Sequence, residues 1–301
     1  MKLTTRNLLI VLVVLGAAYG ISQITKRTGR SKSLRAELVV LDTAKVSKVI
    51  ILSAEGEVVL TEAGEGWQVT LKDGTQKNAK ESAVKSLLSS LTTIKPGRLA
   101  AKSEDKWQDY AVDSAGTRVQ VFEGSDKTND IVIGRFGMEG QQRFYTFVRL
   151  FEDQEVYVAN NFMGMSVSKD ANSYRENILL QLESDSLSSI TYNYPDSSFM
   201  ITKNEKWFLG EQAVDSTTIS DYLRGLDYLS SREFYDAEIL SSPSHQVTLA
   251  FLNQESITFD AYSTVDGLAV RSSENPEEVF LDETLVKKVF KGPSAFLPTS
   301  L

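Results

Sequence analysis

The residues that could carry catalysis in this chain are few and scattered. The single histidine, His245, stands just before an expected strand at 246–252, and any Ser-His-Asp triad would have to use it. No Gly-x-Ser-x-Gly motif accompanies it. The Ser-x-x-Lys spacing of a serine–lysine nucleophile occurs three times without a companion motif, at Ser82–Lys85, Ser103–Lys106 and Ser166–Lys169. We therefore predict no catalytic residues, and an envelope hydrolase stays an alternative.

Metal and cofactor chemistry has equally little support. The chain has no cysteine, which excludes disulfides, thiolate nucleophiles and cysteine-type zinc sites. Asp126–Asp130 places oxygen ligands at alternate positions but lacks the glycine and distal glutamate of a calcium loop, so we interpret it as a solvated turn. The glycines of 134–137 and 137–140 are typical of hairpin turns and not of a phosphate-binding loop. We predict no metal and no cofactor.

Several aromatic and methionine residues could instead contact a partner, because Trp, Tyr and Met are enriched at interfaces. The candidates are Trp107, Tyr110, Tyr192, Tyr194, Phe162, Met163 and Met165. Trp107 and Tyr110 lie in a charged loop, whereas Tyr192 and Tyr194 share one face of an expected strand. The alternative is ordinary core packing, which for residues 162–165 means packing between the two halves of the chain.

The elements that must position these residues occur twice in one order. The matched segments are 48–52 with 188–192, Trp67 with Trp207, Ser82–Ile94 with Thr218–Leu229, 147–149 with 269–271, and Glu155–Val158 with Glu278–Leu281. The spacing between matched positions shrinks along the chain, as loop deletions in the second copy would produce. A repeat of this length is a domain and not a solenoid unit. The repeated place of the two tryptophans predicts that both belong to cores.

Each copy is predicted to be a mainly antiparallel sheet with one helix packed on a face. In the first copy, apolar residues recur at three- and four-residue spacing from Val84 to Ile94, which indicates an amphipathic helix. Pro96-Gly97 is expected to end that helix and begin a loop. The fold class is therefore α+β: an N-terminal transmembrane helix followed by two tandem, internally duplicated domains. The expected divisions are 1–25 (membrane anchor), 26–40 (basic linker), 41–160 (first repeat), 161–182 (connecting segment, helical or irregular) and 183–301 (second repeat).

The charges are unevenly distributed. The first 35 residues contain seven basic and no acidic side chains, whereas the whole chain has 32 Lys and Arg against 40 Asp and Glu. An acidic body argues against nucleic acid as a partner, because phosphate binding needs a clustered basic surface.

Residues 7–25 carry no charge and are mostly apolar, which predicts a membrane anchor. As a helix, nineteen residues span about 28 Å, close to the hydrocarbon thickness of a bilayer. A cleaved signal peptide is the alternative. Two basic residues precede this segment and five follow it, which favours a cytoplasmic body, although long domains translocate regardless of such charges. The charge pattern alone therefore leaves the side of the membrane open.

Most of residues 36–300 resembles one bacterial family, catalogued as domain of unknown function forty-three-forty. The resemblance lies in Asp42-Thr43-Ala44 before a strand, the Trp67 hairpin, the helix at 83–91, the strand Ile131–Gly134, and Tyr174-Arg175 before Ile178–Leu180. It implies a single-span protein of the inner membrane with its body in the periplasm. It also implies association with ABC-type transport components or gliding-type auxiliary proteins. It implies no catalytic residues.

These observations lead to one expected function and one further alternative. We expect a non-catalytic, membrane-anchored envelope protein that serves as an accessory or assembly subunit of an ABC-type transport complex or another envelope complex. Its partners are then the membrane, through residues 7–25, and other membrane or envelope proteins. The further alternative is an extracytoplasmic module that binds a small ligand or a glycan through exposed aromatic residues such as Trp107 and Tyr192.

Overall fold

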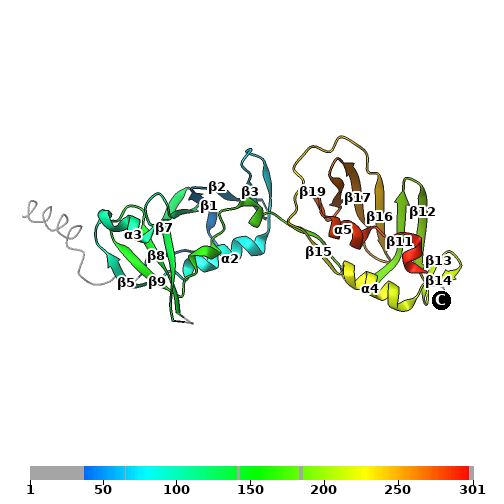
Figure 1. Cartoon of the computed structure of the whole chain (residues 1–301), viewed down its shortest axis with the longest axis horizontal. Coiled ribbons are helices and arrows are strands. Elements are labelled where there is room, and N and C mark those ends of the chain that lie inside the picture. Colours follow the sequence, from blue (N-terminus) through cyan, green and yellow to red (C-terminus); the bar gives the residue numbers. More distant parts are fainter. Residues whose placement is uncertain (1–36, 65, 141–142, 183–185, 298–301) are drawn as a thin grey trace, which may run out of the picture.

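The structure, a computed structural model, describes residues 37–64, 66–140, 143–182 and 186–297. Two large antiparallel sheets form two units that lie end to end along the long axis of the molecule (Figure 1). We call the part up to residue 160 the first unit and the part from residue 186 the second unit. The connecting segment, 161–182, joins them. The predicted mainly antiparallel architecture with few helices is confirmed.

The first unit contains a nine-stranded sheet. Its strands in spatial order are β4 (Gln76–Ala79), β3 (Gly66–Thr70), β2 (Gly56–Ala63), β1 (Val46–Ser53), β6 (Thr117–Glu123), β7 (Asp126–Glu139), β8 (Arg143–Leu150), β9 (Val156–Asn160) and β5 (Pro96–Ala101). Alternating side chains of β1 and β6 enter the core, as expected for strands with one buried face.

The second unit contains an eight-stranded sheet. Its strands in spatial order are β14 (Gln212–Ala213), β13 (Trp207–Leu209), β12 (Ser197–Lys203), β11 (Leu187–Tyr194), β16 (His245–Phe251), β17 (Ile257–Thr264), β18 (Gly267–Ser272) and β19 (Asn275–Phe280). Matched in chain order, these strands have the same neighbours as the first eight strands of the other sheet. A shared strand order is what an internal duplication would produce.

The two sheets differ at one edge. In the first unit, β5 follows the helix and pairs with β9. In the second unit the corresponding strand, β15 (Tyr228–Ser230), pairs with β10 (Ile178–Gln181) of the connecting segment. The connecting segment therefore belongs structurally to the second unit at its end, where it forms a two-stranded sheet.

The described residues contain four α-helices: α2 (Glu81–Thr92), α3 (Trp107–Tyr110), α4 (Ser216–Leu226) and α5 (Glu283–Val289). Helix α2 buries Val84, Leu87, Leu88 and Leu91, the stripe that the sequence spacing predicted. Helix α4 begins after Asp215, whose side chain accepts a hydrogen bond from the Thr218 amide at 2.8 Å. Its buried residues Ile219, Tyr222 and Leu226 pack into the core of the second unit.

Each unit has its own hydrophobic core. Trp207 is buried in the core of the second unit, and Trp67 is half-buried against that of the first. A smaller cluster around Val112, Val132 and Phe147 packs on the other face of the first sheet. Residues of β5 and α3 pack against that cluster.

Four expectations about local structure are wrong. Residues 126–130, which we interpreted as a solvated turn, form the beginning of β7. The glycines at 134 and 137 lie within β7, which runs to Glu139, whereas Gly140 does lie in the turn that follows, with a φ of 67°. Pro96-Gly97 begins strand β5 and not a loop, since β9 provides the ladder partner that the local sequence does not reveal. The connecting segment is neither helical nor wholly irregular, because it contains two 3₁₀ turns (Gly164–Ser166 and Ala171–Ser173) and β10.

The predicted membrane anchor at 7–25 lies outside the described residues. In the part of the chain that the structure does describe, no helix has the length and apolar character needed to cross a membrane.

Candidate functional site

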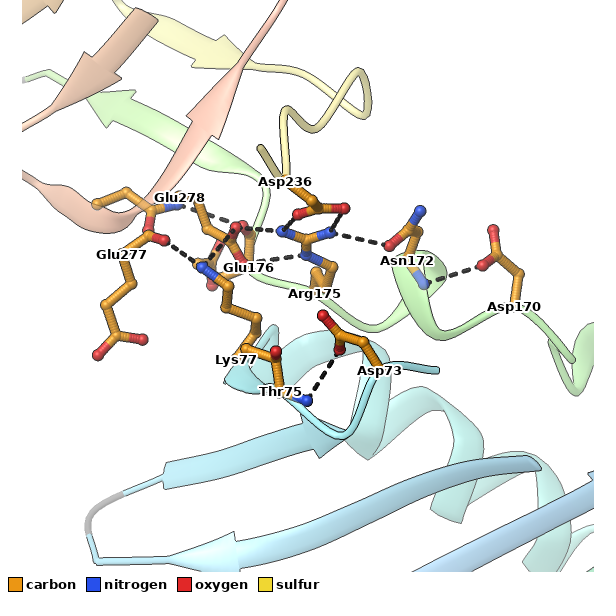
Figure 2. A network of polar contacts seen from close by, with 11 residues as sticks. Asp73, Thr75, Lys77, Asp170, Asn172, Arg175, Glu176, Asp236, Glu277 and Glu278 are labelled. Carbon is orange, nitrogen blue, oxygen red and sulfur yellow. Dashed lines mark hydrogen bonds and ion pairs between the residues drawn. The ribbon is translucent and has the colours of Figure 1, made fainter. Parts of the chain in front are cut away.

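The connecting segment places Arg175 between the two units, where it forms the centre of a buried ionic joint (Figure 2). Its Nε donates a hydrogen bond to Oε1 of Glu278 at 3.1 Å, and its Nη2 donates to Oε2 of the same carboxylate. Nη1 and Nη2 also donate to the two oxygens of Asp236, at 3.1 and 2.7 Å. Asn172 accepts a further bond from Nη1. We call these four residues and Lys77 the ionic joint.

Burial makes this joint energetically important. Arg175 is 1% exposed and Glu278 is fully buried, whereas Asp236 is half-exposed. Burial alone would lower the pKa of Arg175, but its hydrogen bonds to Glu278 and Asp236 outweigh that effect and raise the pKa. The Phe234 ring lies 3.8 Å from the guanidinium carbon and covers the cation. Arg175 is therefore a permanent, fully paired charge.

Lys77 on β4 connects the first unit to the same joint. Its Nζ donates to the backbone carbonyl of Glu277 at 2.6 Å and lies 3.7 Å from the Glu278 carboxylate (Figure 2). In addition, the side-chain amide of Asn275 on β19 donates hydrogen bonds to the backbone carbonyls of Glu176 and Ile178 in the connecting segment. These contacts join β4, the connecting segment and β19, so the joint holds the two units in one relative orientation.

A second buried arginine, Arg149 on β8, has a different environment. It is 3% exposed and donates only to backbone carbonyls, those of Val112, Leu150, Phe151 and Asp153. Its guanidinium carbon lies 3.7 Å from the Trp107 ring. Burial lowers the pKa of Arg149, in contrast to Arg175. The Arg149 guanidinium therefore holds Val112, shortly after α3, and the β8–β9 turn together through their backbone carbonyls.

Trp107 and Arg149 line a pocket of about 530 Å³ on the first unit, which we call the aromatic pocket. Phe151 and Arg118 lie on its wall, with the Arg118 guanidinium carbon 3.2 Å from the Phe151 ring centroid. Arg118 also forms an ion pair with Asp130 at 2.7 Å. The pocket thus combines aromatic surface with polar groups of both signs, because Glu104 and Asp113 line it as well.

Exposed and half-buried apolar side chains occur on the β7–β8 hairpin and on the 3₁₀ turn that contacts β7. We call these residues together the methionine patch: Phe136, Met138, Phe144, Met163 and Met165. Met138 and Phe144 are cross-strand neighbours, and the rings of Phe136 and Phe144 lie 6.4 Å apart. Met138 is 59% and Met165 is 68% exposed.

The two methionines of the connecting segment reach this hairpin through a close backbone contact. The Gly164 amide donates to the Thr146 hydroxyl at 2.9 Å, and that hydroxyl donates to the Phe162 carbonyl at 2.7 Å. A Cβ at position 164 would lie 2.7 Å from side-chain atoms of Ile133 and Thr146. Glycine is therefore required there, and it places Met163 and Met165 beside the hairpin.

The candidate contact residues lie in different environments, some buried and some at the surface. Tyr192 and Phe162 are fully buried, with Tyr192 stacked on Phe199 at 4.4 Å, so neither side chain is available to a partner. Tyr194 is half-buried and donates to the Lys291 carbonyl. The aromatic alternation of β11 thus belongs to the core, because that face of the strand packs under Phe296 and its neighbours. Trp107 lines the aromatic pocket and Tyr110 packs beneath it on Phe147.

The candidate catalytic residues do not form a catalytic arrangement in the described part of the chain. The lysine of each Ser-x-x-Lys sequence lies next to a carboxylate, in the pairs Lys85–Glu81, Lys106–Asp109 and Lys169–Glu55. His245 Nδ1 is 2.9 Å from the hydroxyl of its neighbour Ser244, and no carboxylate of a described residue bonds to the ring. Among the described residues, no group of three or more His, Asp or Glu side chains could hold a metal ion.

Sequence reasoning did not select Arg175, Glu278 or Arg149 as important residues. A weak signal existed, because Glu278 and Arg149 lie in segments that recur between the two halves of the sequence. Arg175 follows Tyr174 in one of the segments that carry the family resemblance. Nothing in the sequence indicates that Arg175 and Glu278 meet.

The family model described as Domain of unknown function (DUF4340) matches residues 67–247, from β3 in the first unit through the connecting segment to β16 in the second. No curated protein and no solved structure matches the chain.

Proposed function

The chain belongs to the family described as Domain of unknown function (DUF4340), and on this basis we propose that it is a non-catalytic accessory subunit of an envelope membrane complex. In this proposal residues 7–25 anchor the chain in the inner membrane, and the body lies in the periplasm. The methionine patch docks onto an apolar surface of a partner protein, which we propose to be a subunit of an ABC-type transport complex or of another envelope complex.

The methionine patch is the observation that carries this proposal. Large apolar side chains gathered at one exposed place are typical of protein–protein interfaces, whose central residues are enriched in aromatic residues and methionine. Met138 lies on the β7–β8 hairpin and Met165 on the connecting segment, and the fold brings the 3₁₀ turn Gly164–Ser166 of that segment into contact with β7. Unbranched methionine side chains also adapt readily to a partner surface.

The ionic joint supports the same role. A docking subunit must hold its contact surface at a defined position, and the joint holds the connecting segment between the two sheets through Arg175 and Lys77. Met163 and Met165 lie on that segment. Two units with the same strand order, whose relative position is held by buried charges, suit the role of a scaffold.

The first prediction concerns partner binding. In full-length tagged protein, the double variant Met138→Glu, Met165→Glu is expected to reduce partner recovery at least tenfold, because two carboxylates would be desolvated at the contact. Recovery is measured by purification from native membranes in mild detergent, with mass spectrometry.

The matched control is Leu240→Glu, Val265→Glu, which adds the same charge at two exposed apolar positions outside the patch. We expect this control to retain the partners. Equal recovery with the patch variant, or equal loss with the control, would contradict the proposal.

A second candidate function is ligand or glycan binding in the aromatic pocket, and Trp107 on its wall is the observation that favours it. Aromatic rings with nearby polar groups are typical of small-ligand sites. If this function is correct, a glycan array should contain ligands whose binding is lost in Trp107→Ala and kept in Met200→Ala, a change at an exposed residue of the second unit. An array without any such ligand would count against this candidate.

A further inference from the structure

A small basic pocket lies where the two units meet the connecting segment. It has a volume of about 190 Å³ and is lined by the start of α2, by the connecting segment and by Arg232, which follows β15. Three of its lining residues are basic: Lys80, Arg175 and Arg232. Within the described part of the chain, no carboxylate lines it. This composition stands out in a chain with more acidic than basic residues.

Most polar groups of this basic pocket are hydrogen-bond donors with unused capacity. Arg232 is exposed and forms no hydrogen bond or ion pair with any residue that the structure describes. Lys80 donates one bond, to Oδ1 of Asn177 at 2.9 Å, although its ammonium can donate three. The hydroxyls of Ser82 and Ser86 lie one turn apart on α2 and line the same pocket.

The charge of the pocket comes from Lys80 and Arg232. Arg175 forms part of the wall, but Glu278 and Asp236 already compensate its charge. Glu81, next to Lys80 in the sequence, is bound by Lys85 at 2.6 Å. Two cations without carboxylate partners therefore face one small concavity, one from the first unit and one from the second.

We propose that the basic pocket binds a phosphate-type oxyanion, which bridges Lys80 of the first unit and Arg232 of the second. Such a ligand presents several negatively charged acceptor oxygens, which complement a lining of ammonium, guanidinium and hydroxyl donors. The oxyanion reinforces the orientation that the ionic joint sets, because it joins the same two units at a second point. Free phosphate and the phosphate of an anionic lipid headgroup share this chemistry.

The test uses the full-length protein in detergent and measures binding of inorganic phosphate by calorimetry, with chloride at equal ionic strength as the reference. The wild type is expected to bind phosphate, and Arg232→Gln and Lys80→Gln are each expected to weaken binding about tenfold, equivalent to about 1.4 kcal/mol. Arg224→Gln is the matched control, because Arg224 is exposed on α4, outside the pocket. We expect this control to bind like the wild type.

A second arm distinguishes the two sources of phosphate. The protein is placed in nanodiscs of phosphatidylcholine alone or with phosphatidylglycerol, and hydrogen exchange is followed at the start of α2 and around Arg232. Protection by free phosphate assigns a soluble ligand, and protection only with phosphatidylglycerol assigns a lipid headgroup. Absence of protection in both arms, or equal weakening by Arg224→Gln, would overturn the proposal.

Discussion

Arg175→Met is expected to lower the free energy of unfolding by about 3 to 5 kcal/mol, the largest effect among our predictions. The substitution removes the cation that pairs with Glu278 and leaves that carboxylate fully buried with only Lys77 nearby, at 3.7 Å. It also removes the hydrogen bonds to Asp236 and Asn172 that close the joint. Urea denaturation followed by circular dichroism measures the loss.

Two further variants show whether the unpaired charge causes this loss. Arg175→Met, Glu278→Met removes both buried charges and is expected to recover most of the stability, because a well-packed apolar pair replaces a buried ion pair at little net cost. Arg224→Met removes an arginine from an exposed pair with Asp221 and should change stability by no more than about 1 kcal/mol. If Arg175→Met is as stable as Arg224→Met, the joint does not hold the units together.

Arg149→Met is expected to lower the free energy of unfolding by about 3 kcal/mol, because it leaves buried carbonyl groups without their donor. Val112, before β6, and Phe151, after β8, both depend on this guanidinium. The loss should be accompanied by exposure of Trp107, whose ring packs on the guanidinium at 3.7 Å. Urea titration with fluorescence and hydrogen exchange at 107–112 measures both effects.

The chain provides a matched control for this prediction. Arg271 on β18 occupies the position in the second copy that corresponds to Arg149, yet its buried Nε has no hydrogen-bond partner. Arg271→Met should therefore change stability far less than Arg149→Met. Arg149→Lys should not restore the wild type, because one ammonium cannot reproduce the planar arrangement of guanidinium donors. Equal losses in Arg149→Met and Arg271→Met would contradict this explanation.

Elements with strong local periodicity were predictable from the sequence. Helix α2 follows from the spacing of Val84, Leu87, Leu88 and Leu91, which gives one buried stripe whatever the rest of the chain does. The repeated order of strand, tryptophan and helix predicted two sheets, and both sheets have one strand order. These patterns lie within short segments, so they can be recognised without knowledge of the fold.

Elements defined by a distant partner were not predictable in this way. Strand β5 begins with Pro96-Gly97 and has little β propensity, and its pairing with β9 defines it. The candidate site depends even more on such contacts. The sequence does not distinguish exposed from buried tyrosines, so it could not show that Tyr192 is fully buried in the core.

The sequence by itself determined the family, the mainly antiparallel sheets with few helices, the buried face of α2 and a composition that argues against cysteine chemistry and nucleic-acid binding. Only the tertiary structure decided which charges are buried together and which apolar residues remain outside. Arg175 and Glu278 are 103 residues apart in the chain, and Met138 and Met165 lie in different elements. Hydrophobic periodicity reports the face of one element, whereas an ion pair or a surface patch depends on how several elements pack, a relation that no local pattern encodes.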